Sequence, residues 1–172
     1  CTYPNDEKGQ PQYPEGAPAM AFQHALERYI QLAREKGAIP VLFTPTTRVK
    51  NAQGKTAFQT GPDDKVVSSH FTPAKPGYAY SGDYIATIKQ TAAANQVPVI
   101  DLEKMTIDFA NRHADDWMDY WLAVDEQRYP NYKHQTSGTR ANPDTTHFQQ
   151  KGAVAVANMV AEGIRQTPEL RD

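Results

Sequence analysis

The sequence lacks most of the features that would assign a chain to a class at once. Its 172 residues include a single cysteine, which rules out an internal disulfide and a cysteine-rich zinc site. The formal net charge at pH 7 is only −2, so no basic surface for nucleic acid or an anionic membrane is expected. No apolar run approaches the roughly 20 residues that a helix needs to cross a bilayer. We therefore expect neither nucleic acid nor a membrane as a partner.

What the chain does contain suits one packed domain. Hydrophobic residues make up 39% of the sequence and charged residues 22%, which is enough apolar material for a core. The length also fits one domain, so we expect residues 1–172 to form a single domain. Cys1 stands first, without Met or a signal peptide ahead of it, and we expect this start to be a processed, truncated or cleaved end.

Apolar periodicity predicts helices that alternate with short apolar runs. A helix followed by a glycine and a continuous apolar run is typical of a parallel sheet covered on both faces. The expected helices are 19–37, 81–96, 103–124 and 147–165, the expected strands are 38–45 and 97–102, and the long polar loops are 46–80 and 125–144. The loop 46–80 is long for a structureless connection, which favours a functional loop or a small excursion.

The third helix carries an aromatic stripe at helical spacing. Its members are Met105, Phe109, Trp117, Tyr120 and Trp121. A ligand shelf is one interpretation, but side chains at this spacing are more often core, so we predict that they pack inside the protein.

The inventory of elements is short of strands. Two strands cannot cover one face of four helices, and natural doubly wound sheets have about five strands or more. The sequence is therefore interpreted as the later part of an α/β sandwich whose early strands lie elsewhere.

An acid and a histidine stand three residues apart ahead of the last helix, in the stretch NPDTTHFQQKG (residues 142–152). Thr146 and Gln149 have capping-box spacing, which predicts His147 in the first helical turn and Asp144 just outside it. From there Asp144 can accept a hydrogen bond from the imidazole Nδ1–H and leave Nε2 free as a base. By spacing alone, the commoner alternative is a helix cap beside a surface histidine.

Four stretches together resemble one known family. NPDTTHFQQKGAVAVANMVAEGI resembles the C-terminal block of the SGNH (GDSL-type) hydrolases, and within them it is most similar to the rhamnogalacturonan acetylesterases of carbohydrate esterase family 12. LERYIQLAREKGAIPVLFTPTTR, GDYIATIKQTAAANQVPVIDLEKMT and RYPNYKHQTSGTRANPDTTHF resemble further segments of that family in the same order. The resemblance covers most of residues 19–166 and implies a three-layer α/β/α, flavodoxin-like sandwich with a parallel sheet, whose N-terminal strands are missing from this chain.

The resemblance also implies roles for individual residues. His147 matches the catalytic base of the family, and Asp144 matches the acid that orients it. Asn5, in TYPNDEKG, matches the asparagine that donates to the oxyanion, although Tyr3 stands where the family has glycine. The alternative for this stretch is a solvated turn.

The family's nucleophile block, Gly-Asp-Ser, has no match in the sequence. The substitutes, Ser68, Ser69, Ser81, Ser137 and Cys1, follow no predicted strand, and a nucleophile needs a positioned base beside it. We therefore expect the chain to be the C-terminal portion of the protein and to be inactive alone. An N-terminal fragment or second chain would then be the partner that carries the serine.

The implied function is a serine-type carboxylic ester hydrolase, secreted or periplasmic in a bacterium, that removes acetyl groups from a pectic polysaccharide or a small ester. Arg48, Tyr129 and Tyr132 are candidates for a sugar or uronate contact, with loop anchoring as the alternative. The resemblance implies no metal or cofactor.

Three other functions stay open. One is a non-catalytic carbohydrate-binding relative or inactive fragment, and another is a structural domain in which Asp144 only caps a helix. A third is a metal-dependent hydrolase, but His113 near Asp115 and Asp116 is more typical of a solvated helix position than of a metal ligand.

Overall fold

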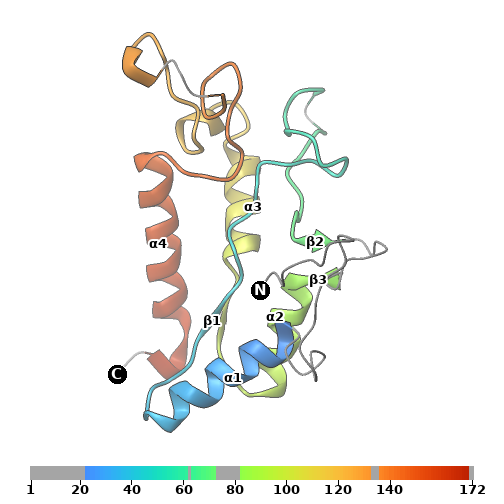
Figure 1. Ribbon diagram of the computed structural model, residues 1–172, viewed down its shortest axis with the longest axis vertical. Coiled ribbons are helices and arrows are strands. Elements are labelled where there is room, and N and C mark those ends of the chain that lie inside the picture. Colours follow the sequence, from blue (N-terminus) through green and yellow to red (C-terminus); the bar gives the residue numbers. More distant parts are fainter. Residues whose placement is uncertain (1–21, 62, 73–81, 133–135, 171–172) are drawn as a thin grey trace, which may run out of the picture. The chain divides into compact units, whose positions relative to one another are not determined.

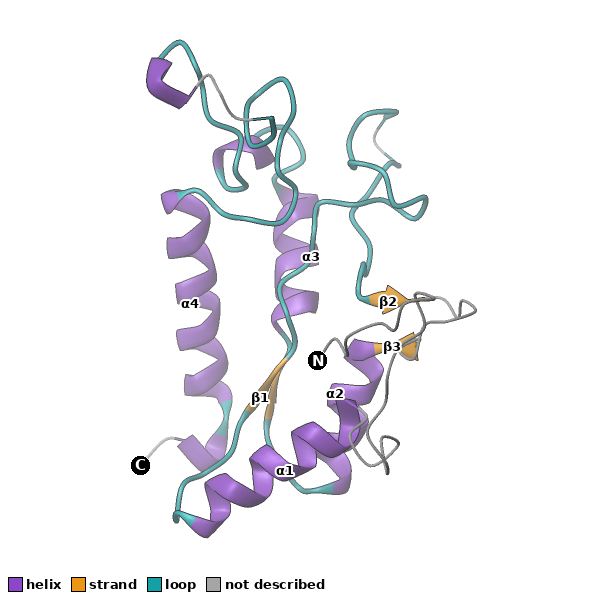
Figure 2. Ribbon diagram, viewed as in Figure 1, coloured by secondary structure: helices purple, strands orange, loops and turns teal. Residues whose placement is uncertain are grey.

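A computed structural model of the protein describes residues 22–61, 63–72, 82–132 and 136–170 (Figure 1). Contacts between Cα atoms divide the chain into two compact units. Unit 1 comprises residues 1–44, 70–100 and 172, and unit 2 comprises residues 45–69 and 101–171. Helices and a parallel strand pair together give the expected α/β class (Figure 2). The single domain 1–172 stays a prediction.

Unit 1 combines two helices with two strand pairs. Its elements are α1 (Phe22–Glu35), β1 (Leu42–Phe43), β2 (Phe71–Thr72), β3 (Gly82–Asp83), α2 (Tyr84–Ala94) and β4 (Val99–Ile100). The strands β1 and β4 pair in parallel, with Leu42 opposite Val99, and β2 and β3 pair antiparallel. The parallel pairing of the two predicted apolar runs is confirmed, whereas β2 and β3 were not expected from the sequence.

The two helices of unit 1 pack through a small apolar cluster. The first ends at the glycine that the sequence indicates, whereas the second, expected over 81–96, is shorter and begins only after β3. Ile30, Ala92 and Val97 form the buried cluster. After α1, Gly37 has φ 71°, and the N–H of Ala38 donates to the carbonyl of Ala33 at 3.0 Å, as expected for a glycine-terminated helix. At the start of α2, Asp83 is the N-cap and accepts from Ala86 N–H.

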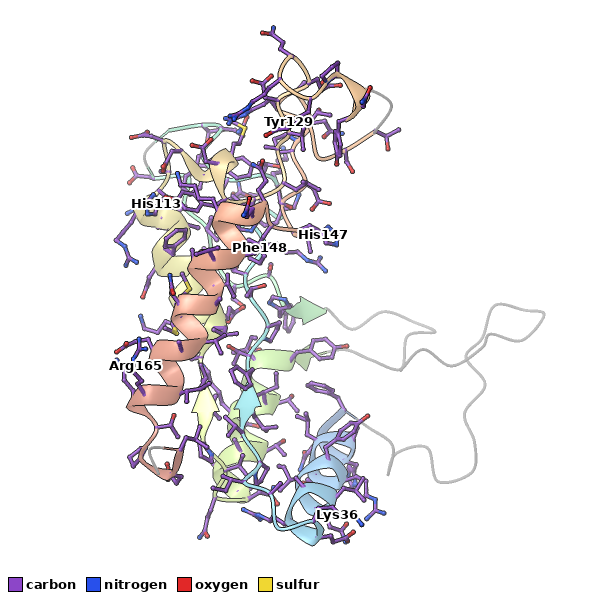
Figure 3. All side chains as sticks on the ribbon, turned by 90° about the vertical axis from the view of Figure 1, so that its left-hand side faces the viewer. Lys36, His113, Tyr129, His147, Phe148 and Arg165 are labelled. Atoms are coloured by element: carbon purple, nitrogen blue, oxygen red, sulfur yellow. The ribbon has the colours of Figure 1, made fainter. Side chains whose placement is uncertain are left out.

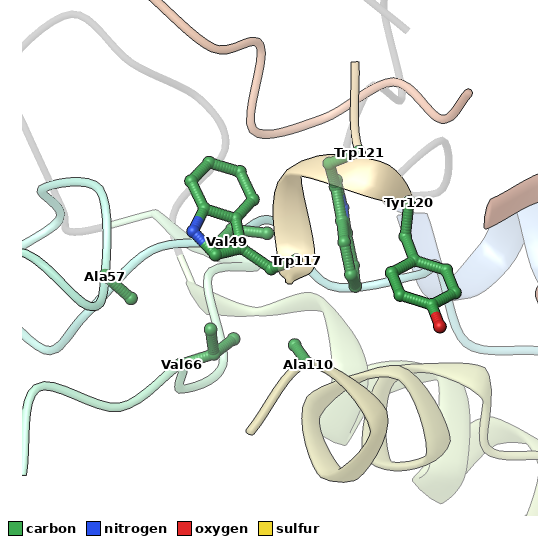
Figure 4. Packing of buried hydrophobic residues seen from close by; sticks show 7 residues of the cluster. All are labelled: Val49, Ala57, Val66, Ala110, Trp117, Tyr120 and Trp121. Carbon is green, nitrogen blue, oxygen red and sulfur yellow. The ribbon is translucent and has the colours of Figure 1, made fainter. Parts of the chain in front are cut away.

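In its described residues, unit 2 contains two α-helices and three short 3₁₀ turns. They are α3 (Leu102–Arg112), η2 (Trp117–Asp119), η3 (Pro130–Tyr132), α4 (Gln150–Gln166) and η4 (Pro168–Leu170). The helices α3 and α4 contact each other and run side by side (Figure 1). The buried core of the unit consists of Val49, Ala57, Val66, Ala110, Trp117, Tyr120 and Trp121 (Figure 4). The interpretation of the aromatic stripe as core is thus confirmed for Trp117, Tyr120 and Trp121.

The predicted helix 103–124 is wrong beyond Arg112. His113 is the C-cap of α3, and its ring nitrogen Nδ1 lies 2.9 Å from Asp116 Oδ1. The N–H of Asp116 donates to the carbonyl of His113 at 3.1 Å. Aspartate favours such local bonds over a continuing helix, so the chain turns here and reaches the core aromatics through η2.

Candidate functional site

The acid of the Asp144–His147 pair shapes its own loop. Asp144 Oδ1 accepts hydrogen bonds from the N–H groups of Thr146 at 2.8 Å and His147 at 3.1 Å. Aspartate commonly closes turns in this way. The capping box expected between Thr146 and Gln149 is wrong, because α4 begins at Gln150 with Gln149 as an N-cap that makes no side-chain cap bond. His147 therefore lies in the loop ahead of α4.

The second carboxylate oxygen of Asp144 holds the imidazole. His147 Nδ1 lies 2.8 Å from Asp144 Oδ2. The His147 side chain is 73% exposed and the Asp144 side chain only 20%. Figure 3 shows His147 directed outward from the loop ahead of α4. With Nδ1 donating to the carboxylate, Nε2 carries a free lone pair and is the ring atom available to a substrate or a nucleophile.

The carboxylate is arranged to stay charged. Partial burial alone would raise the pKa of Asp144, but the hydrogen bonds from the His147 ring and from the N–H groups of Thr146 and His147 outweigh it. The pKa of the Asp144 carboxyl therefore lies below its usual value. An ionised acid at this position can orient the ring and stabilise an imidazolium.

Backbone hydrogen bonds pin the loop on two sides. Leu122 N–H donates to the carbonyl of His147 at 2.8 Å, and Asp144 N–H donates to the carbonyl of Leu122 at 2.9 Å. In addition, Val49 N–H donates to the carbonyl of the buried Thr145 at 2.9 Å. Both members of the pair are thus attached through backbone bonds to a single residue, Leu122.

A second histidine–aspartate pair provides an internal comparison. The contact between His113 Nδ1 and Asp116 Oδ1 measures 2.9 Å, at the same spacing of three residues. Here the histidine is 31% exposed and the acid 44%, and the ring of His113 packs on Phe109 and Tyr120 with centroids 4.3 and 4.7 Å apart. In the His147 pair the histidine is more exposed than the acid, whereas in the His113 pair the acid is more exposed than the histidine.

The candidate substrate-contacting residues differ in their exposure and in the partners of their side chains. Arg48 is exposed and precedes Val49, which is bonded to the acid–histidine loop. Within the described part of the chain, its guanidinium has no ion-pair or hydrogen-bond partner. Tyr129 is 53% exposed, with the guanidinium of Arg128 5.6 Å from its ring centroid.

Tyr132 has a more constrained position than Tyr129. The hydroxyl of Tyr132 packs directly against Gly138, because a Cβ built on that glycine would lie 2.8 Å from the hydroxyl oxygen. This contact fits the loop-anchoring alternative for Tyr132, whereas Tyr129 has the more exposed ring.

Several candidates from the sequence lie outside the described residues: Asn5, Cys1 and Ser81. Of the described serines, Ser68 donates to Glu103 at 2.6 Å and Ser69 accepts from Arg48 N–H at 3.4 Å. No hydrogen bond joins a described serine to His147. Over the same residues, no group of three or more His, Cys, Asp or Glu could hold a metal ion, and no helix is long and apolar enough to cross a membrane.

Sequence reasoning missed the contacts of Gln149 and the close backbone approach at Gly152, although it placed Gly152 on the inward face of the last helix. Gln149 was expected to cap the helix, yet its amide points to the carbonyls of Met118 and Trp121. Gly152 is buried, and a Cβ there would lie 2.2 Å from the carbonyl oxygen of Tyr120. Its place four residues after Phe148 gave a helical signal but no sign of this close backbone approach.

Comparison with known proteins defines the class of the chain's relatives as rhamnogalacturonan acetylesterases. Two proteins of Bacillus subtilis (strain 168) are similar to it. The "Probable rhamnogalacturonan acetylesterase YesY" is 29% identical over 149 residues, which are 87% of this chain and 52% of that protein. The "Rhamnogalacturonan acetylesterase RhgT" is 30% identical over 166 residues, which are 94% of this chain and 57% of that protein.

These matches confirm the resemblance found in the sequence: the chain is related to rhamnogalacturonan acetylesterases over most of its length. The chain spans about half the length of the curated relatives it matches. No family model matches it, and no solved structure is significantly similar to it.

Proposed function

We propose that these residues belong to a serine-type carbohydrate esterase that removes acetyl groups from a rhamnogalacturonan-type polysaccharide. The observation that carries the proposal is the 2.8 Å contact between His147 Nδ1 and Asp144 Oδ2, with the acid largely enclosed and the base facing water. The printed names of the two relatives supply the class of ester. The SGNH-type three-layer sandwich is part of the same proposal.

In the proposed mechanism a serine hydroxyl attacks the acetyl carbonyl. His147 Nε2 takes the serine proton and then returns it to the sugar hydroxyl that leaves, while Asp144 holds the ring through Nδ1. Water then hydrolyses the acetyl-enzyme, with His147 Nε2 again accepting the proton. Asn5 is proposed as one donor to the oxyanion, and such a donor contributes about 10²–10³-fold in rate.

The serine is proposed to lie outside residues 1–172. Two observations support this: no described serine is hydrogen-bonded to His147, and the relatives are nearly twice as long as the region matched. A segment or chain that carries the serine would complete the site, and this chain alone would be inactive. A secreted or periplasmic location is proposed on the same relationship.

Arg48 is the substrate contact best supported by its surroundings. Its backbone adjoins Val49, which is bonded to Thr145 of the acid–histidine loop, and its exposed guanidinium has no partner among the described residues. A guanidinium fork binds a carboxylate in a bidentate manner, which suits a uronate near the acetylated sugar. Tyr129 is proposed as a stacking surface and Tyr132 as a weaker candidate.

The test uses the full-length gene product. A fluorophosphonate probe should label one serine, and peptide mapping should place it outside residues 1–172. Labelling of a serine within this chain would overturn that part of the proposal. Sugar binding without labelling and without release of acetate would instead identify a non-catalytic carbohydrate-binding relative.

A further inference from the structure

The loop that carries the acid and the histidine depends on a short backbone segment, residues 118–122. Leu122 bonds both Asp144 and His147 through its N–H and carbonyl. Two residues earlier, the carbonyl of Tyr120 accepts from Gln149 N–H at 2.8 Å, and Trp121 pairs with Phe148 in an isolated antiparallel bridge. A displacement of residues 118–122 would therefore also displace the loop that carries Asp144 and His147.

The side chain of Gln149 fixes that segment. Its Nε2 donates to the carbonyl of Met118 at 2.6 Å and to the carbonyl of Trp121 at 2.9 Å. Carbonyls at the end of a helical turn lack partners within the turn, and the end of η2 is such a place. The amide is half-buried, so removing it would leave two poorly solvated acceptors unsatisfied.

Within the described residues, the side-chain amide of Gln149 makes no other hydrogen bond. It makes no cap bond to α4, because Gln149 is the N-cap through its backbone alone. Deleting the amide therefore removes its two hydrogen bonds to the carbonyls of Met118 and Trp121. The start of α4 and the backbone bond from Gln149 N–H to the carbonyl of Tyr120 remain. Mutation can therefore separate the role of the Gln149 backbone at the start of α4 from the role of its side chain, which holds residues 118–121.

We propose that Gln149 is a positioning residue for the proposed esterase reaction. By bonding Met118 and Trp121 it fixes the backbone at Leu122, and Leu122 sets the place of Asp144 and His147. This inference rests on the proposed function, since positioning matters only where His147 acts as a base. Gln149 itself touches neither substrate nor the reacting atoms.

The experiment compares neighbouring glutamines in the full-length protein. Gln149→Met keeps the length of the side chain and removes both hydrogen bonds. Gln150→Met is the matched control, because Gln150 is exposed and makes no side-chain hydrogen bond within the described part of the chain. A displacement of about 1 Å costs as much as 10²-fold in rate, so we expect kcat of Gln149→Met to fall about 10- to 100-fold with KM within about twofold. Gln150→Met should match the wild type.

A second readout separates positioning from stability. The His147 Nδ1–H proton that is donated to Asp144 should give a low-field proton resonance in ¹⁵N-histidine-labelled protein. We expect Gln149→Met to broaden or shift this resonance at a temperature where the circular dichroism remains native. Gln149→Asn keeps an amide but shortens its reach by one methylene, so its kcat should lie between those of the wild type and Gln149→Met.

The outcomes distinguish this inference from the proposed function. An unchanged kcat and an unchanged resonance in folded Gln149→Met would overturn the positioning role. If His147→Ala retains full activity, the proposed function fails whatever Gln149 does. A shifted resonance without any effect on kcat would show that Gln149 braces the pair structurally and would reject its role in the reaction.

Discussion

At the scale of single residues, exposure separates two pairs that distance alone does not. His147–Asp144 and His113–Asp116 differ by only 0.1 Å in their Nδ1–oxygen contacts, 2.8 against 2.9 Å. A general base needs a lone pair that a substrate can reach and an acid that holds the other ring nitrogen. Only the His147 pair has the exposed ring and the enclosed acid. His113 instead packs between aromatic rings in the core of unit 2.

The first prediction follows from this contrast. His147→Ala in the full-length protein should lower kcat for p-nitrophenyl acetate by about 10³-fold or more, because loss of a base disables the whole triad. His113→Ala, the matched control, should keep kcat within about threefold at a temperature where it is folded. Equal losses in the two variants would show that His147 has no special chemical role.

The lowered pKa of Asp144 gives a prediction for stability against pH. A carboxyl whose pKa is lower in the folded state than its unfolded value of about 3.9 stabilises the fold above that value, and this stabilisation is lost as the pH falls through the folded pKa. We expect Asp144→Asn to be less stable than the wild type at pH 7. The difference should shrink steadily below about pH 4.

Urea denaturation of both proteins from pH 7 down to pH 3 measures this difference directly. Asp63→Asn is a suitable control, because Asp63 is exposed and makes no ion pair or side-chain hydrogen bond with any residue that the structure describes. A gap between wild type and Asp144→Asn that widens on acidification would contradict the assigned direction of the pKa shift.

Arg48 gives a prediction about substrate preference. Hydrogen bonds to charged groups contribute about 1.5–3 kcal/mol, so Arg48→Gln should lower kcat/KM on acetylated rhamnogalacturonan about 10-fold or more. Its activity on the uncharged p-nitrophenyl acetate should change less than twofold. Arg112→Gln, at the exposed end of α3, is the control. A parallel loss on both substrates would point to disruption of the fold.

At the scale of elements, Gly152 tests how α4 is seated. Helix propensity alone favours alanine over glycine by about 1 kcal/mol. The Cβ of alanine would however lie 2.2 Å from the carbonyl oxygen of Tyr120, which also accepts from Gln149. We expect the clash to dominate, so Gly152→Ala should destabilise the protein by about 1–3 kcal/mol.

Urea denaturation measures this effect, and the control lies on the same helix. Asn158 is exposed in the middle of α4, so Asn158→Ala should stabilise by up to about 0.7 kcal/mol through propensity alone. If Gly152→Ala stabilises the protein to a similar extent, the close approach of α4 to Tyr120 is not maintained in solution.

The same scale shows what the sequence could predict. Apolar periodicity located α1, α2 and the parallel strands, because these segments carry one apolar face or a continuous apolar run. It failed at 113–116, where the local bonds of His113 and Asp116 stop a helix that the aromatic spacing would continue. It also misplaced the start of α4, since the capping-box spacing of Thr146 and Gln149 gave no sign that Asp144 caps the turn.

The candidate site was predictable only in part for a similar reason. Asp144 and His147 are close in sequence, so their contact is local and their spacing predicts it. Gln149 acts on carbonyls 28 and 31 residues away, and no local pattern encodes such a partner. The same holds for the bond from Val49 to Thr145 that sets Arg48 beside the loop.

At the scale of the whole molecule, unit 1 leaves much apolar surface uncovered. Tyr29 is 71% exposed, Ile39 59% and Phe43 39%. Among the described residues the parallel sheet has two strands, whereas stable sheets of this class have several more. Exposed apolar surface on this scale marks a region that another part of a protein covers, which supports the proposal of a larger sandwich.

The edge of β1 that faces away from β4 pairs with no described strand, and this gives a measurable prediction. Leu42 and Thr44 donate their N–H groups to Pro98 and Ile100, so by alternation the N–H of Phe43 points away from β4. If a further strand pairs with that edge in the full-length protein, the amide of Phe43 exchanges slowly with solvent. We expect hydrogen exchange at Phe43 to be at least about 10³-fold slower than at Ala52, a residue of the exposed loop, because only the global opening of a core strand would release it. Equal exchange rates at Phe43 and Ala52 would leave β1 as a true edge and reject the extended sheet, even if the esterase activity is confirmed.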